Sequence, residues 1–228
     1  MSVLHDVLDA ARRPSAIVAF DLDSTLLDNR PRNVRVLREF GQAEGLTALL
    51  AIETRHFTSW NLRDAMVGAG VAPERAAACY ERLRAFWLPR FFSSAYCAGD
   101  AAVPGAPELV RAVHDAGAHV AYVTGRYEEM RHGTLEALAR WSFPLPGERV
   151  HLVMKPSFEE SDDLWKREAH ARLRAIGSVV AAFDNEPTHI NGYGESFPDA
   201  ILVHLATDHS GRPVALRDGV QSIRDFRR

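Results

Sequence analysis

The chain has 228 residues, of which 46% are hydrophobic and 25% are charged, and its formal net charge at pH 7 is −3. This composition is typical of a globular protein with one large domain, or with a core and a smaller insert. The slightly acidic balance excludes a broad basic surface for nucleic acid or an anionic membrane, although it is compatible with a local basic groove. The two cysteines lack the spacing of a zinc site or a disulfide framework. Without a signal-peptide core or an apolar run of about 18 residues, we expect a cytoplasmic protein with no membrane partner.

The first elements are a helix and a buried strand. Residues 2–12 carry apolar side chains at helical spacing, and an uninterrupted apolar run then predicts a strand of a parallel sheet at about 15–21. Asp21 and Asp23 follow this apolar run directly, and strand geometry places both side chains on the same side. Two carboxylates this close repel each other unless a cation lies between them, and Mg²⁺ prefers such ligands. The alternative is a strand that ends in a polar turn, with Asp23, Ser24 and Thr25 at the start of a helix.

The segment 28–102 has a different, helical character. Helical periodicity recurs there and strand signals are weak, so we expect a helical insert of these residues. The predicted helices of the insert cover residues 34–40, 46–52, 62–67 and 73–88. Its aromatic side chains either line a pocket or form the insert's own core; they are Phe57, Trp60, Phe86, Trp87, Phe91, Phe92 and Tyr96.

After residue 103 apolar strands alternate with amphipathic helices. The expected strands cover 119–124, 150–154, 178–183 and 200–205, and the expected helices cover 107–117, 127–141, 161–175 and 187–193. This alternation predicts an α/β core of residues 1–27 and 103–228, built on a doubly wound parallel sheet with right-handed crossovers. The segment 208–228 carries no clear signal for either helix or strand.

Polar residues follow three of the predicted strands. Thr124 ends one strand and Asp184 ends another, as Asp21 and Asp23 do for the first. The carboxyl ends of parallel strands share one edge of a sheet, and ligands bind at that edge in open α/β folds. We therefore expect these four residues to converge.

Three segments in this order resemble the motifs of the haloacid dehalogenase (HAD) superfamily. They are Asp21-Leu-Asp23-Ser-Thr25, Thr124-Gly125-Arg126 and Phe183-Asp184, and each follows an apolar strand. The resemblance covers most of the chain outside the insert. It implies a Rossmann-like HAD core, and it identifies residues 28–102 as a helical cap of the C1 type.

The resemblance also implies roles for the motif residues. Asp21 would be the nucleophile that forms an aspartyl-phosphate, and Asp23 would be the general acid and then the general base. An acid at position 23 is typical of the phosphatases of the superfamily rather than its dehalogenases. Thr124, Gly125 and Arg126 would contact the substrate phosphate, although Arg126 could instead contact the cap. Magnesium would be held by the side chains of Asp21 and Asp184 and by the backbone carbonyl of Asp23.

Two features leave alternatives open. The lysine that offsets the negative charge is either Lys155, which ends a strand before a proline, or Lys166, which lies 18 residues before Asp184. The Asp162-x-x-x-Lys166 spacing and the Thr-Gly-Arg segment resemble the phosphatase module of polynucleotide kinases, which slightly favours Lys166. Where the superfamily often has a second acid, either Asn185 or Glu186 would assist the metal.

The leading hypothesis is therefore a Mg²⁺-dependent phosphatase of a small phosphate ester. One alternative is a nucleic-acid 3′-end phosphatase, which the acidic charge and the predicted cap argue against. Another is an inactive HAD-like binding module, suggested by the absent second acid. The ten histidines show no HxH or HExxH pattern, so a histidine zinc site is not expected. The sequence identifies neither the substrate nor the oligomeric state.

Overall fold

The computed structural model describes residues 2–227 and contains a six-stranded sheet in the order β5-β4-β1-β6-β7-β8, in which each neighbouring pair is parallel. The strands are β1 (Ala16–Phe20), β4 (His119–Tyr127), β5 (Val150–Lys155), β6 (Ser178–Asp184), β7 (Ile201–Leu205) and β8 (Gln221–Ile223). The predicted doubly wound α/β core is confirmed. The segment without a clear sequence signal contributes the edge strand β8.

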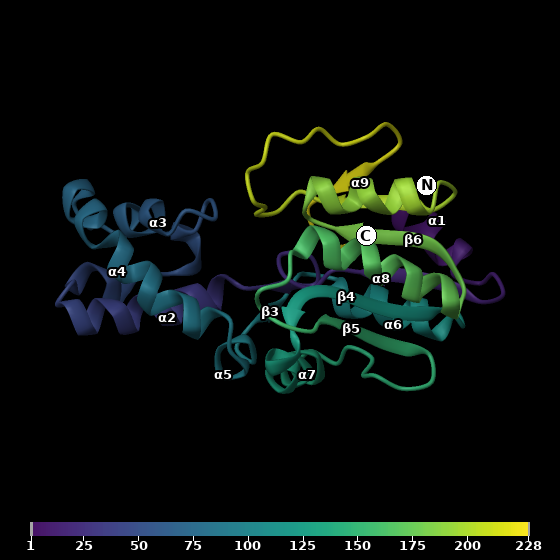
Figure 1. Ribbon diagram of the computed structural model, residues 1–228, viewed down its shortest axis with the longest axis horizontal. Helices are drawn as coiled ribbons and strands as arrows, with labels where there is room; N and C mark the ends of the chain where they lie inside the picture. The colour runs from purple at the N-terminus through teal and green to yellow at the C-terminus, as the bar shows by residue number, and fades with distance from the viewer. Residues whose placement is uncertain (1, 228) are drawn as a thin grey trace.

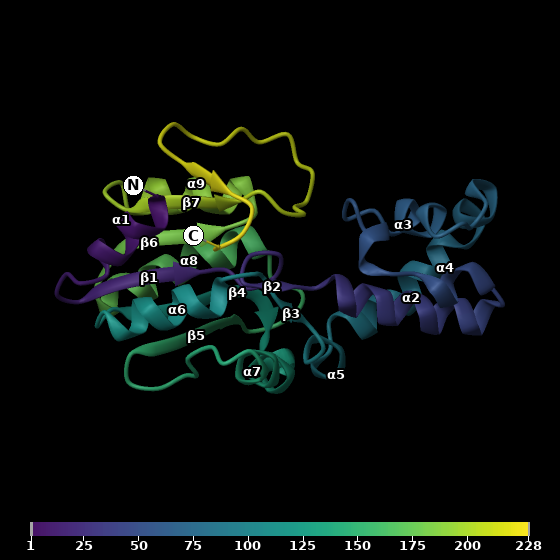
Figure 2. The ribbon, with the colours of Figure 1, turned by 180° about the vertical axis from the view of Figure 1, so that it is seen from behind.

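Helices cover both faces of this sheet (Figures 1 and 2). Their bounds are α1 (Val3–Ala10), α6 (Ala106–Asp115), α7 (Arg131–Arg140), α8 (Asp162–Ile176) and α9 (Pro187–Ser196). Within β1, Val18 and Phe20 pack in a core with α1, α6 and α7, whereas Ile17 and Ala19 pack in a second core with α8 and α9. Because both faces of the strand are buried, its sequence is an apolar run without alternation.

The register of the central strands brings the predicted residues to one edge. Phe20 at the end of β1 lies opposite Tyr122 of β4 and Phe183 of β6. The next residue in the chain after Phe20 is Asp21 and the next after Phe183 is Asp184, so both reach the carboxyl edge together. Since β4 and β6 flank β1 on opposite sides, this edge is also a topological switch point, where ligands bind in open α/β sheets.

The helical insert leaves and re-enters the core through a short antiparallel pair, β2 (Leu27–Asp28) and β3 (Ala101–Ala102). Figure 1 shows its helices α2 to α4 to one side of the sheet. The insert contains α2 (Arg30–Glu44), η1 (Thr47–Ala51), η2 (Thr54–His56), α3 (Leu62–Gly68), α4 (Pro73–Phe91) and α5 (Ser94–Cys97). The second expected helix is a 3₁₀ helix, η1, which packs so closely on α2 that a Cβ at Gly41 would lie 2.6 Å from that of Leu49.

The insert has a hydrophobic cluster of its own. Residues from α2, η1, α3 and α4 form it, among them Leu37, Phe40, Leu49, Met66 and Leu83. Helix α5 instead contacts the core, where the amide of Gly133 in α7 donates to Ser94 Oγ at 3.1 Å. None of the helices within residues 2–227 combines the length and the apolar character that a membrane-crossing helix needs.

Candidate active site

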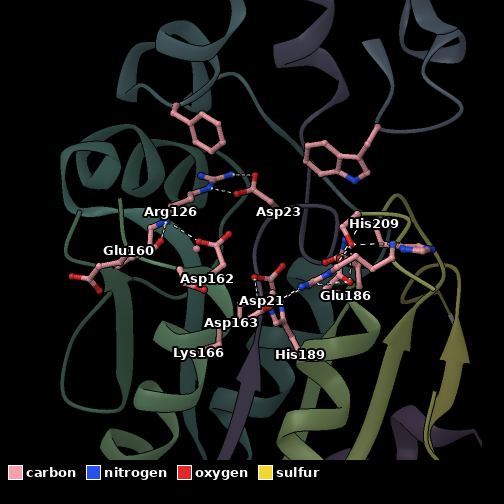
Figure 3. Close-up of a pocket in the computed structure, with 18 of the residues that line it drawn as sticks. Asp21, Asp23, Arg126, Glu160, Asp162, Asp163, Lys166, Glu186, His189 and His209 are labelled. Atoms are coloured by element: carbon pink, nitrogen blue, oxygen red, sulfur yellow. Dashed lines mark hydrogen bonds and ion pairs between the residues drawn. The ribbon is translucent and has the colours of Figure 1, made fainter. Parts of the chain in front are cut away.

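A pocket of about 710 Å³ lies above the carboxyl edge of β1. Figure 3 shows Asp21 and Lys166 deep in it, Asp23 and Arg126 closer to the insert, and Glu186 and His209 across the pocket from Glu160 and Asp162. Residues of the insert, including Trp60 and Phe91, line the same pocket. Both the α/β core and the insert therefore line the site.

Lys166 joins the two carboxylates that the register brings together. Its Nζ donates to Asp21 Oδ1 at 2.8 Å and to Asp184 Oδ2 at 2.6 Å, and all three residues are buried. Burial raises the pKa of the Asp21 carboxyl to about 6; Lys166 opposes this rise and the charge of Asp184 adds to it. Burial alone would also raise the pKa of Asp184, but Lys166 and His189 hold it well below its usual value.

Helix α8 explains why Lys166, and not Lys155, reaches Asp21. Along α8, residues Trp165, Lys166, Ala169, His170 and Leu173 are buried, and their spacing defines one face of a helix packed on the sheet. Lys155 lines the pocket but its Nζ is engaged by the loop that follows β5. It donates to the carbonyls of Phe158 and Glu160 at 3.2 Å and 2.9 Å, and to Asp162 Oδ1 at 2.7 Å.

The Thr-Gly-Arg segment extends β4 into the pocket. Thr124 is fully buried, and its side-chain oxygen accepts a hydrogen bond from the Arg126 amide at 3.1 Å. Gly125 and Arg126 line the pocket. A Cβ at Gly125 would lie 2.9 Å from Asp162 Oδ2, so a larger residue at this position would displace the Asp162 side chain.

Asp23, whose side chain is 26% exposed, belongs to a cluster of four charges in which the other three side chains are buried. Arg126 donates to both of its carboxylate oxygens at 2.9 Å and 2.8 Å, and Arg32 Nη2 donates to Oδ1 at 3.0 Å. The same two arginines also bind Asp100, with Arg32 Nε at 2.9 Å and Arg126 Nη2 at 2.5 Å. Burial alone would raise the pKa of Asp23, but the two guanidinium groups hold it well below its usual value, so the carboxyl is ionised.

Arg32 and Asp100 were not singled out in the sequence. Arg32 lies in the first turn of α2 and Asp100 directly precedes β3, so both belong to the insert and its return segment. Their side chains are fully buried. The only sequence signal is the presence of ionisable residues close to the junctions with the core, which is too common to identify a site.

The two candidates for the second polar residue after Asp184 point in different directions. Asn185 Oδ1 lies 3.2 Å from Thr25 Oγ1, which is also 3.1 Å from Asp21 Oδ2, so Asn185 is linked to Asp21 through Thr25. Glu186 accepts from the amide and hydroxyl of Ser210, at 2.9 Å and 3.0 Å. Its carboxylate therefore binds the loop after β7, whereas Asn185 is the residue linked to Asp21.

A histidine not expected from the sequence lies beside Asp184. His189 Nε2 is 2.8 Å from Asp163 Oδ1, and its Nδ1 is 3.7 Å from Asp184 Oδ1. Arg212 also pairs with Asp163, at 2.7 Å. These contacts fix the start of α9 and the start of α8 against the strand end that carries Asp184.

The carboxylate pair fits a hard divalent cation. Within residues 2–227 no group of three His, Cys, Asp or Glu side chains is arranged around a common metal position. Magnesium does not need one, since it binds through one or two carboxylates and completes its coordination with water and phosphate oxygens. Asp21 and Asp184 supply two carboxylates against the single charge of Lys166, which leaves a net negative charge in a buried place. This surplus favours a bound cation.

Comparisons with known proteins place this geometry in a family. A family model of haloacid dehalogenase-like hydrolases matches residues 16–190. No curated protein matches the chain. Among solved structures, CbbY from Rhodobacter sphaeroides in complex with phosphate is similar over 94% of this chain and 95% of its own, with a TM-score of 0.52 and 16% identity. A dehalogenase solved with an intermediate complex is similar over 93% of both chains, with a TM-score of 0.52 and 18% identity.

A third likeness involves RNA repair. A chain of the Pnkp1/Rnl/Hen1 RNA repair complex is similar over 86% of this chain and 43% of its own, with a TM-score of 0.50 and 14% identity. At such identities these likenesses show a shared fold.

Proposed function

Because this chain belongs to the haloacid dehalogenase-like hydrolases, we propose that it is a Mg²⁺-dependent phosphomonoester hydrolase that acts through an aspartyl-phosphate on Asp21. The observation that carries this proposal is the buried Asp21–Lys166–Asp184 chain at the inner end of the pocket. A carboxylate attacks an anionic phosphate only where the negative charge is offset, and the ammonium group of Lys166 supplies the positive charge that does so. Magnesium held by Asp21 and Asp184, with the backbone carbonyl of Asp23, would add Lewis-acid stabilisation of the phosphate oxygens.

The proposed reaction has two steps. A carboxylate oxygen of Asp21 bonds to phosphorus, the bond from phosphorus to the alcohol oxygen breaks, and Asp23 gives a proton to that oxygen. Water then attacks the phosphorus, Asp23 takes a proton from it, and the bond to Asp21 breaks to release phosphate. The backbone amides around Thr124 and Gly125 lie at the same edge and are proposed to hold the phosphoryl oxygens.

Asp23 needs a change of partners to act as an acid. Its carboxylate is held by Arg126 and Arg32, both of which prefer the charged form. A phosphate monoester carries more charge than a carboxylate and accepts bidentate bonds from arginine. We propose that the incoming phosphate takes Arg126 from Asp23, which lets the pKa of Asp23 rise toward the value that burial favours.

We also propose that residues 28–102 act as a cap over this site, with residues 1–27 and 103–228 as the catalytic core. Trp60 and Phe91 of the insert line the pocket, and Arg32 of the insert binds the motif residue Asp23. A cap that contacts the reacting residues would exclude water from the pocket during phosphoryl transfer.

Replacement of Asp21 by Asn tests the nucleophile. In the presence of Mg²⁺, Asp21→Asn should release phosphate from a panel of phosphorylated metabolites roughly 10³-fold or more slowly than the wild type, because an amide cannot form the acyl-phosphate. The control is Asp6→Asn on the exposed face of α1, which should keep wild-type rates. EDTA should abolish wild-type turnover and Mg²⁺ should restore it. Equal rates for Asp21→Asn and the wild type would reject the proposal.

One observation favours the alternative of a nucleic-acid 3′-end phosphatase, namely that Lys166 rather than Lys155 contacts Asp21. The insert beside the pocket and the net charge of −3 count against a long polyanion. Release of phosphate from a 3′-phosphorylated oligonucleotide, faster than from the metabolite panel, would make this the better assignment. No phosphate release from any substrate would favour an inactive binding module.

A further inference from the structure

Four aromatic side chains line the pocket, three from the insert and one from the core. Trp60 lies between η2 and α3, Phe91 ends α4, Phe92 follows it, and Phe158 lies on the loop after β5. The other aromatic residues of the insert pack elsewhere; Phe57, for example, is buried in the insert's own cluster. Only some of the aromatic side chains of the insert therefore line the pocket among the described residues.

The four rings form a continuous row from the insert to the core. The ring centroids of Trp60 and Phe91 are 6.1 Å apart, those of Phe91 and Phe92 are 5.0 Å apart, and those of Phe92 and Phe158 are 5.1 Å apart. The middle of the row is fixed from behind. Trp87 stacks on Phe91 at 4.4 Å, and the Arg32 guanidinium lies 4.3 Å from the centre of the same ring. We call these four residues the aromatic row.

The two ends of the aromatic row are open to the pocket. Phe91 is 2% exposed, whereas Trp60 is 36% and Phe158 is 40% exposed. Exposed rings that line a pocket, here in edge contact with the fixed rings of Phe91 and Phe92, form a surface on which a flat ligand group can stack.

The size of the pocket agrees with a ligand larger than a short phosphorylated alcohol. A volume of about 710 Å³ lies within the range of pockets that bury a drug-sized ligand. One part of it holds Asp21 and Lys166, and another part is lined by the aromatic row. A phosphate monoester bound at Asp21 would thus have its alcohol group directed at a stacking surface.

We propose that the substrate is a phosphate monoester whose alcohol carries a planar heteroaromatic ring, as in a mononucleotide, and that this ring stacks on Trp60. The proposal rests on the phosphatase function above and names its substrate class. A sugar phosphate without the ring has the same reacting group, but leaves Trp60 and Phe158 exposed. The aromatic row therefore distinguishes substrates by their alcohol leaving group, since the phosphate is the same in all of them.

A matched pair of substrates tests the proposal. Adenosine 5′-monophosphate and ribose 5-phosphate share the phosphate and the sugar and differ by the base. The wild type should hydrolyse the nucleotide with a kcat/KM about 10-fold or more above that for the sugar phosphate, mainly through a lower KM, because stacking contributes to binding in every state of the reaction. Equal values of kcat/KM would overturn the inference and leave the phosphatase function standing.

Substitutions in the aromatic row test whether it causes the difference in kcat/KM between the nucleotide and the sugar phosphate. Trp60→Ala should lower the nucleotide-to-sugar ratio of kcat/KM by roughly 5- to 150-fold, and Trp60→Phe should keep most of it, since a smaller ring still stacks. Phe158→Leu provides a second variant on the core, where folding of the insert is not at risk. Leu145→Ala, on an exposed loop, is the control and should leave the ratio unchanged.

A binding experiment decides the inference without turnover. The Asp21→Asn variant in the presence of Mg²⁺ should bind adenosine 5′-monophosphate at least about 10-fold more tightly than ribose 5-phosphate in calorimetry. If the wild type releases phosphate from no substrate of the panel but this difference in binding is found, the phosphatase function fails and the ring site stands. The absence of any difference in binding would overturn the ring site itself.

Discussion

Asp100 lies outside the sequence motifs but shares both arginine partners of the motif residue Asp23. Its carboxylate is fully buried and accepts hydrogen bonds from Arg32 and Arg126, the two residues that also hold Asp23. With Asp100 present, two positive and two negative charges balance in the cluster. Without it, two guanidinium groups would share the single charge of Asp23 in a buried place, which is costly.

We therefore predict that Asp100→Asn lowers the free energy of unfolding by about 3–5 kcal/mol, the usual cost of leaving a buried charge without its partner. Urea denaturation, followed by fluorescence, measures this change. Glu108→Gln is the control, because the exposed pair of Glu108 with Arg111 adds little. A loss for Asp100→Asn no larger than that for Glu108→Gln would show that Asp100 is not needed for charge balance.

The motif residues and their partners differ in how far the sequence could predict them. Asp21, Asp23, Thr124 and Asp184 follow apolar strands, so their convergence is a consequence of parallel pairing. Arg32 lies 9 residues after Asp23, within a helix of the insert. Its contact with Asp23 depends on where the insert lies against the core, which no local pattern determines.

At the scale of elements, α5 and α7 connect the end of the insert to the core. Their contact is close because α7 has glycine where they meet: a Cβ at Gly133 would lie 1.9 Å from the carbonyl oxygen of Ser94. The Ser94 hydroxyl also donates to the carbonyl of Glu129 at 2.9 Å and accepts from the amide of Gly133 at 3.1 Å. This contact fixes the return of the chain from the insert to β3.

Gly133→Ala should separate these two helices. The added methyl group cannot be accommodated without a backbone shift, so we predict a loss of about 1–3 kcal/mol in the free energy of unfolding. Gly68→Ala in α3 is a matched control, because the nearest atom to its new Cβ would be 3.8 Å away. That variant should be unchanged or more stable by up to about 1 kcal/mol, since alanine favours helices. Thermal and urea denaturation compare the two variants, and equal stabilities would contradict the close contact.

At the scale of the whole molecule, the hydrophobic clusters of the core and of the insert are separate, and both parts of the chain line the pocket. The core clusters include β1 and its neighbours, and the insert cluster includes α2, α3 and α4. The buried charges and the aromatic row connect them. Because the insert has a hydrophobic cluster of its own, the helices α2 to α4 are the part that we expect to move when substrate enters.

The stability of the whole molecule should depend on pH through His170 in α8. Burial lowers the pKa of His170 to about 4, with Arg174 and Lys166 adding to the effect, compared with 6.5 in an unfolded chain. Between these values the unfolded state binds the proton more tightly, so acid favours unfolding through this group. The contribution of His170 to stability is therefore full above about pH 6.5 and is lost as the pH falls toward 4.

Comparison with a variant isolates this effect from other titrating groups, such as Asp21. The free energy of unfolding of His170→Gln should fall less than that of the wild type between pH 7 and pH 5, as measured by urea denaturation at each pH. His5→Gln, on the exposed face of α1, should follow the wild type. Parallel profiles for His170→Gln and the wild type would contradict a neutral, buried His170.

The sequence by itself determined the parallel α/β core and the convergence of the polar residues at the ends of its strands on one edge of the sheet. These features follow from apolar runs and their spacing, which are local properties that lead strands to be buried and paired. Only the tertiary structure decided which lysine contacts Asp21, whether Asn185 or Glu186 stays beside it, and which aromatic side chains of the insert line the pocket. The local sequences of Lys155 and Lys166 are both suitable, with a slight preference for Lys166, and the direction of each side chain in the folded chain distinguishes them. Contacts between segments tens of residues apart depend on the packing of the whole chain.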